Sequence, residues 1–144
     1  MGSRFRFEKL EVWQEARSLN RAIYGFTREF PKDEMFGLTS QLRRAAVSVA
    51  ANIAEGSGRN SDRDFAHFLE QAYGSLMETA SLLYLARDQH YGSEVNLGAI
   101  WDRLELLARR IASLNRSLAV RNSKTPFVRS LSRLTLDPRP STLD

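Results

Sequence analysis

Few side chains in this sequence are equipped for catalysis, since it has no cysteine and only two histidines. Without cysteine there is no disulfide framework, thiolate metal site or thiol nucleophile. A di-iron site in a helical bundle needs two Glu-x-x-His pairs and two further glutamates, whereas the sequence offers only Asp64 with His67. No glycine-rich phosphate loop occurs, and Ser40, Ser48 and Ser75 have no neighbouring histidine. We therefore expect no catalytic residue, no metal ligand and no cofactor.

Arginine is the residue type that best equips this chain to bind a partner. The sequence has 21 basic and 17 acidic side chains and a net charge of +4. Guanidinium groups bind phosphates and carboxylates through paired hydrogen bonds, and phosphate contacts give binding that depends on salt rather than on base sequence. The candidates for binding nucleic acid are Arg43, Arg44, Arg59 and Arg63, and in a second basic run Arg109 and Arg110.

A structural role is the alternative for these arginines. Members of the first group could pair with acids such as Glu55 or Glu78, inside the molecule or across a subunit interface. The second group lies towards the end of a predicted helix, where the helix dipole favours cations. Both interpretations remain open at this point.

A second set of candidates is Asn52, Glu55 and Gly56, where polar side chains interrupt a stretch of small and apolar residues. The helix dipole disfavours a carboxylate near a helix C-terminus, so we expect an arginine or a backbone N–H to compensate Glu55. One interpretation is hydrogen bonding that specifies the fold. The other is a small pocket around Asn52 and Glu55, belonging to a ligand-binding or metal-binding enzyme.

Helices must position these side chains, because apolar residues recur at spacings of three and four. The expected helices cover about residues 8–30, a stretch that starts between 34 and 39 and ends at 56–58, residues 61–88, and residues 93–121. Ser61 and Asp64 match a capping box at the third start. Gly92 suits the left-handed position that often follows a helix end.

The third and fourth expected helices have the most informative patterns. In the fourth, apolar residues form a heptad seam over three repeats, consisting of Leu97, Ile100, Leu104, Leu107, Ile111, Leu114 and Leu118. In the third, Tyr73, Met77, Leu82, Tyr84 and Leu85 widen the apolar arc beyond one stripe. That width predicts burial on more than one side, either within a bundle or at a subunit interface.

Four helices joined by short loops can bury their apolar stripes only against one another. The sequence therefore predicts an all-α fold, an antiparallel up-down-up-down four-helix bundle over residues 1–121. Residues 122–144 lack the pattern, and we expect a flexible or loosely docked tail. No apolar run approaches the length of a membrane span or a signal peptide, so we expect no membrane contact and a cytoplasmic location.

Four motifs in this order are similar to a known family. They are Phe7-Glu8-Lys9-Leu10 with Val12-Trp13, the run Phe36-Gly37-Leu38-Thr39-Ser40-Gln41-Leu42-Arg43-Arg44-Ala45-Ala46, Val47-Ser48 with Asn52-Ile53-Ala54-Glu55-Gly56, and Phe65 with Phe68-Leu69 and Gly74-Ser75-Leu76-Met77-Glu78. Together they resemble the bacterial 23S ribosomal RNA intervening-sequence proteins. One departure is Ala50, where the family usually has proline, so the second helix is expected to be straighter here.

The resemblance implies a four-helix bundle that associates as a ring, a homopentamer. The accessory protein of diversity-generating retroelements is similar in fold, and it works with a reverse transcriptase and nucleic acid. The resemblance brings no catalytic residues. We therefore expect a non-enzymatic, oligomeric scaffold whose partners are copies of itself, then RNA, DNA, or a nucleic-acid enzyme such as a reverse transcriptase. The alternative is the small-ligand or metal-binding bundle enzyme with its pocket near Asn52 and Glu55.

Overall fold

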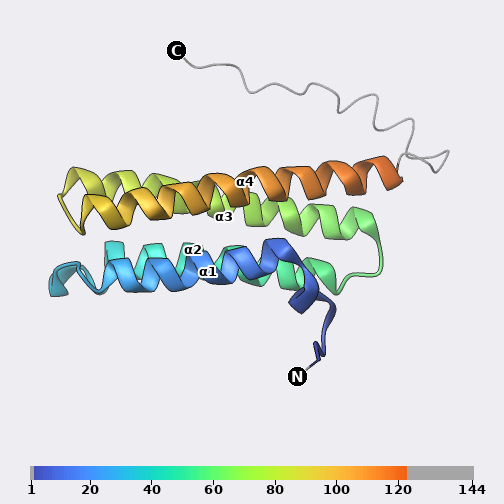
Figure 1. The fold of residues 1–144 in the computed structure, drawn as a ribbon, viewed down its shortest axis with the longest axis horizontal. Coiled ribbons are helices and arrows are strands. Elements are labelled where there is room, and N and C mark those ends of the chain that lie inside the picture. The colour runs from blue at the N-terminus through green and yellow to red at the C-terminus, as the bar shows by residue number, and fades with distance from the viewer. Residues whose placement is uncertain (1, 123–144) are drawn as a thin grey trace, which may run out of the picture.

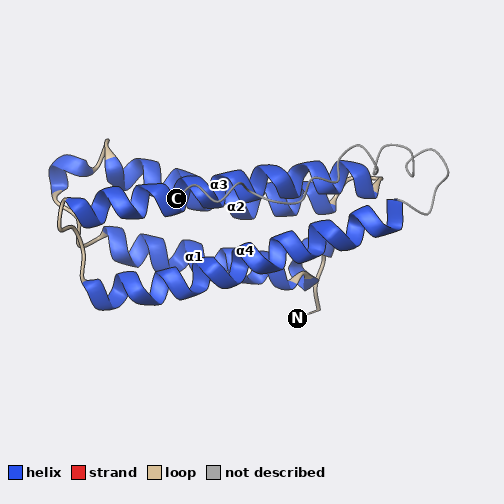
Figure 2. Cartoon of the chain, turned by 90° about the horizontal axis from the view of Figure 1, so that it is seen from above, coloured by secondary structure: helices blue, strands red, loops and turns tan. Residues whose placement is uncertain are grey.

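Four long helices make up the protein in the computed structural model, which describes residues 2–122 (Figure 1). They are α1 (Glu11–Thr27), α2 (Leu38–Ser57), α3 (Asp62–Asp88) and α4 (Glu94–Asn122), with two 3-10 helices, η1 (Arg6–Lys9) and η2 (Lys32–Glu34). The described part contains no strand (Figure 2). The all-α prediction and the number of helices are confirmed. The predicted tail lies outside the described residues, apart from Asn122, which ends α4.

The start of α1 differs from the expectation, which had the helix begin at Glu8. Leu10 has extended backbone angles, φ −77° and ψ 124°, and separates η1 from α1. The ring of Phe7 packs against the ring of Trp13 with centroids 4.7 Å apart, so η1 folds against the first turns of α1. At the other end α1 stops at Thr27, and a turn follows up to Phe30.

The two ends of α3 were predicted with different success. At its start Ser61 is the N-cap, and its side chain accepts a hydrogen bond of 3.1 Å from the Asp64 N–H, as expected. At its end two residues are left-handed, Gly92 as expected and also His90, with φ of 60°, which directly follows the C-cap. The Tyr91 N–H bonds the carbonyl of Ala86 and the His90 N–H bonds that of Arg87, the pattern of a Schellman motif.

Gly92 also has a positive φ, 75°, but for a different reason. A Cβ atom at this position would lie 2.2 Å from the ring of Phe26. The turn between α3 and α4 therefore passes directly over the end of α1, and only glycine leaves room for that approach.

The core lies along the centre of the bundle and includes most of the predicted seam of α4. Six of its seven members are buried, namely Leu97, Ile100, Leu104, Leu107, Ile111 and Leu118, while Leu114 is partly buried. Leu10 and Trp13, expected in the stripe of α1, are also only partly buried. α2 is unbroken through Ala50, where the family usually has proline.

Each helix packs against two others, and α1 with α2 faces α3 with α4 across the core (Figure 1). Polar pairs join α1 and the turn after it to α4 in opposite order along the chain, from Glu11 with Arg110, through Ser18 with Arg103, to Glu29 with Asn96. Within residues 2–122, no helix is long and apolar enough to cross a membrane.

Candidate functional site

The six arginines singled out from the sequence do not form one patch. Arg43 and Arg44 lie in the first half of α2, and Arg59 and Arg63 lie on either side of the turn between α2 and α3. Sixteen positions separate Arg43 from Arg59, which corresponds to roughly 24 Å of helix. Arg109 and Arg110 belong to α4, which does not pack against α2. The structure thus presents three separate pairs of arginines.

One arginine of each pair is engaged within the molecule. Arg43 donates a hydrogen bond of 2.9 Å from Nε to the Thr27 hydroxyl, and its guanidinium lies 4.7 Å from the centre of the Tyr24 ring. Arg59 lies 3.2 Å from a carboxylate oxygen of Glu55 and 4.6 Å from the centre of the Phe68 ring. These contacts make the two side chains part of the packing of α2 against its neighbours.

In the third pair, Arg110 is the engaged residue. It is ion-paired to both Glu11, at 2.8 Å, and Glu15 of α1. By contrast, Arg44, Arg63 and Arg109 are exposed, and their side chains have no ion pair or hydrogen bond within residues 2–122. Of the six candidates, these three are the ones available to an external partner.

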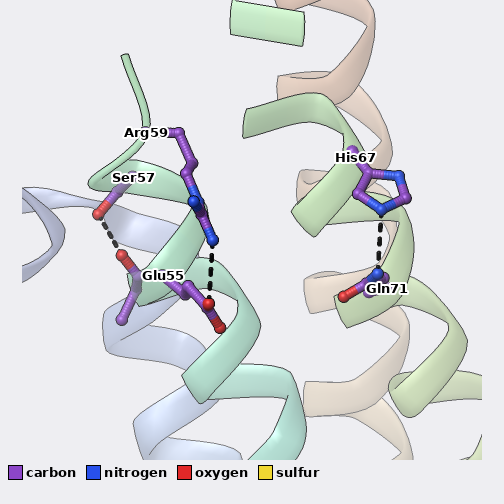
Figure 3. A network of polar contacts seen from close by, with 6 residues as sticks. Glu55, Ser57, Arg59, His67 and Gln71 are labelled. Carbon is purple, nitrogen blue, oxygen red and sulfur yellow. Dashed lines mark hydrogen bonds and ion pairs between the residues drawn. The ribbon is translucent and has the colours of Figure 1, made fainter. Parts of the chain in front are cut away.

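Asn52, Glu55 and Gly56 each have partners inside the molecule. Asn52 donates 2.9 and 3.1 Å hydrogen bonds to the carbonyl and hydroxyl of Ser48, and that hydroxyl lies 2.9 Å from the hydroxyl of Ser75 on α3. Glu55 is compensated by Arg59, as expected for a carboxylate near a helix end (Figure 3). Nearby, His67 bonds only Gln71 of its own helix among the described residues (Figure 3).

Gly56 lies inside α2, and its small size is needed for packing rather than for ending the helix. A Cβ atom there would lie 2.6 Å from Cβ of Phe68 on α3, closer than two carbons can approach. Asn52, Glu55 and Gly56 do not line any of four surface grooves on the described part of the molecule. Within residues 2–122, no three side chains of His, Asp or Glu gather in a way that could hold a metal ion.

A groove that the sequence did not predict lies between α1 and α2. Its volume is about 320 Å³, and its lining is mostly apolar, consisting of Phe7, Trp13, Arg17, Asn20, Val47, Ala50, Ala51 and Ala54. Ala51 is exposed, and Ala50 and Ala54 are partly exposed. A signal was present in the sequence, since Val47 and Ala51 are four apart and lie on one face of the helix.

A second apolar surface lies on the outside of α3. Tyr73, Met77, Tyr84 and Leu85 are between 37% and 56% exposed, although all are large apolar or aromatic residues. The ring of Tyr84 packs against Trp101 of α4 at 4.9 Å. Of the residues that widened the apolar arc in the sequence, only Leu82 is buried in the core of the single chain.

With the fold and these surfaces in view, comparisons with known proteins place the chain. No curated protein matches it. A solved structure of a protein with unknown function, from the S23 ribosomal protein family of Bacteroides thetaiotaomicron VPI-5482, is similar with a TM-score of 0.65 and 22% sequence identity, over 72% of this chain and 97% of that one. At this identity the likeness shows the fold. Residues 8–113 match the family described as 23S rRNA-intervening sequence protein. Since this match covers well over half of the chain, the protein belongs to the 23S rRNA-intervening sequence protein family.

Proposed function

We propose that this protein is a non-enzymatic, oligomeric scaffold whose first partner is a second copy of itself. The observation that carries the proposal is the exposed row of Tyr73, Met77, Tyr84 and Leu85 on α3. Leaving several large apolar side chains together in water is unfavourable, and such a surface commonly marks an interface with another protein. A cysteine-free chain suits a reducing cytoplasm, where we propose that it acts.

The antiparallel up-down-up-down arrangement belongs to the same proposal. It is supported by the opposite order of the pairs between α1 and α4, and by the contact of Arg121 near the end of α4 with Asp62 at the start of α3, at 2.9 Å. The similarity to the intervening-sequence proteins adds the expectation of a ring, with five copies as the specific number to test.

The test of self-association is sedimentation equilibrium on the purified full-length chain at micromolar concentration. We expect a mass several times that of one 16.4 kDa chain, and a fivefold mass would support the pentamer. A single species at the mass of the monomer over the whole concentration range would contradict the proposal.

We further propose that the oligomer binds nucleic acid, or an enzyme that acts on it, through arginines free of internal partners. Arg44, Arg63 and Arg109 are exposed, so they could contact phosphates without breaking an interaction within the chain. The test is the electrophoretic mobility of single-stranded and duplex RNA and DNA at low salt. Replacing all three arginines by glutamine should weaken retardation, whereas unchanged mobility with the wild-type chain would contradict binding.

A further inference from the structure

We propose that copies of this chain meet head to tail, with the outer face of α3 on one copy seated in the α1–α2 groove of the next. This pairing rests on the proposed self-association and goes further, because it names the two surfaces that meet. The charges and the exposed apolar side chains of the two faces support it.

The surface around the α1–α2 groove is mostly basic, and its nearest acid on α2, Glu55, is paired with Arg59. Residues 16–28, which contain most of α1, and residues 35–54, which contain most of α2, have no aspartate or glutamate. The same two stretches carry five arginines, namely Arg17, Arg21, Arg28, Arg43 and Arg44. All of these except Arg43 are exposed. Because α1 and α2 pack side by side, their arginines make one largely positive surface.

The floor of the groove is apolar and built from small side chains. Val47, Ala50, Ala51 and Ala54 supply one side, so the backbone of another helix could approach α2 closely there. Asn20 also lines the groove, and its buried Oδ1 atom has no hydrogen-bond partner in the described structure. An unpaired buried acceptor is costly, and a donor from a partner would satisfy it.

The outer face of α3 has the complementary properties. Residues 64–86 contain no lysine or arginine and carry three acids, Asp64, Glu70 and Glu78. All three acids are exposed, and none forms an ion pair within residues 2–122. The exposed row of Tyr73, Met77, Tyr84 and Leu85 lies on the same helix. Glu70 is three residues from Tyr73 and Glu78 is next to Met77, so this part of α3 offers apolar side chains for the groove and carboxylates for the arginines around it.

Two copies of the same face would not match. Groove against groove would bring arginines together, and α3 against α3 would bring carboxylates together, so each symmetric contact places like charges opposite one another. The complementary contact uses different faces, which lie in the two different layers of the bundle (Figure 1). A contact between different faces leaves one groove and one α3 face free at the two ends of the assembly. Adding further copies in the same way either closes a ring or extends a filament.

A single-stranded nucleic acid is a poorer occupant of this groove. Binding of single strands without sequence preference relies on aromatic rings whose faces are free for bases. Here Trp13 is in an edge-to-face contact with Phe7, and the guanidinium of Arg17 lies 5.6 Å from the centre of the Trp13 ring. A strand of phosphates would also leave the apolar floor without a partner.

Charge reversal on each face tests the pairing. The double variants Arg17→Glu/Arg21→Glu in the groove and Glu70→Arg/Glu78→Arg on α3 should each associate at least tenfold more weakly than the wild type in sedimentation experiments. An equimolar mixture of the two should regain association, because each reversed face then meets an opposite charge. The matched controls, Lys9→Glu/Lys32→Glu and Asp102→Arg/Glu105→Arg, change the same charges at exposed positions outside the two faces and should associate like the wild type.

The possible outcomes distinguish this pairing from the proposed self-association on which it rests. A monomeric wild type would remove self-association altogether. An oligomeric wild type with a fully associating Glu70→Arg/Glu78→Arg variant would leave self-association standing and overturn the pairing. A groove variant that stays oligomeric but loses retardation of single-stranded RNA would also overturn it, assigning the groove to nucleic acid. If circular dichroism shows that Arg17→Glu/Arg21→Glu is unfolded, Ala51→Glu replaces it, since Ala51 is exposed on the groove floor.

Discussion

Arg43 and Arg44 are adjacent in the sequence but have different surroundings. Arg43 is half-buried between the Thr27 hydroxyl and the Tyr24 ring, whereas Arg44 points to solvent with no partner in the described chain. One peptide step on a helix turns a side chain by about 100°, so the pair lies partly inside and partly outside the contact between α1 and α2.

We therefore predict that Arg43→Gln lowers the free energy of unfolding by about 1–3 kcal/mol, through loss of a charged hydrogen bond and a cation–π contact. Arg44→Gln is the matched control and should change it by less than about 0.5 kcal/mol. Urea unfolding followed by circular dichroism measures both. Equal effects of the two substitutions would mean that the contacts of Arg43 contribute nothing to stability.

Glycine at position 56 is predicted to be necessary for the contact between α2 and α3. Gly56→Ala should destabilise the protein by about 1–3 kcal/mol, because the added methyl group would overlap Phe68. Gly74→Ala, on α3, meets nothing within 4 Å and should stabilise by about 0.5–1 kcal/mol, since alanine loses less backbone entropy. Thermal denaturation compares the two, and a stable Gly56→Ala variant would show that the helices can move apart at low cost.

At the scale of the element, the start of α3 depends on one hydroxyl. Ser61 accepts a hydrogen bond from the Asp64 N–H, so Ser61→Ala should cost about 1 kcal/mol. Ser81→Ala, at an exposed position within the same helix, should leave stability unchanged or slightly increased. Urea midpoints distinguish these outcomes, and hydrogen exchange should locate the loss in the first turn of α3.

The features of the helices that could be predicted from the sequence were those determined by local signals. The seam from Leu97 to Leu118 and the cap at Ser61 were predicted, because a period of 3.5 residues and a capping hydroxyl are local signals. The break at Leu10 and the left-handed His90 were not. Both follow from tertiary contacts, the packing of Phe7 on Trp13 and the passage of Gly92 over Phe26.

For the candidate surfaces, the sequence identified residue types but few of their neighbours. It identified Arg43 and Arg59 as candidate cations and Glu55 as one possible acid partner, which the ion pair between Glu55 and Arg59 confirms. Only the structure shows that Tyr24 and Thr27 contact Arg43 and that Phe68 contacts Arg59. The groove beside Ala51 was missed because a small residue is compatible with close packing as well as with an open slot. Whether Ala51 packs closely or borders an open groove depends on how the neighbouring helix is placed.

At the scale of the whole molecule, the inferred head-to-tail contact predicts a specific dependence on salt. Raising ionic strength from 0.1 to 1 M shortens the Debye length from about 10 Å to about 3 Å. Association should weaken by on the order of tenfold without being abolished, because the apolar part of the contact remains. Sedimentation at the two salt concentrations measures this, and association that is unaffected or strengthened by salt would indicate a purely apolar interface.

The packing of α4 on α1 also has a consequence for synthesis. The chain is made from its N-terminus, yet the acids Glu11 and Glu15 find their partner only when Arg110 has left the ribosome. Until then the apolar sides of α1 and α3 that pack against α4 are uncovered. A nascent chain paused before residue 97 would lack the apolar seam of α4, so core residues such as Leu19, Ile23 and Leu83 would be exposed. Such a chain would be a substrate for chaperones that bind exposed apolar segments.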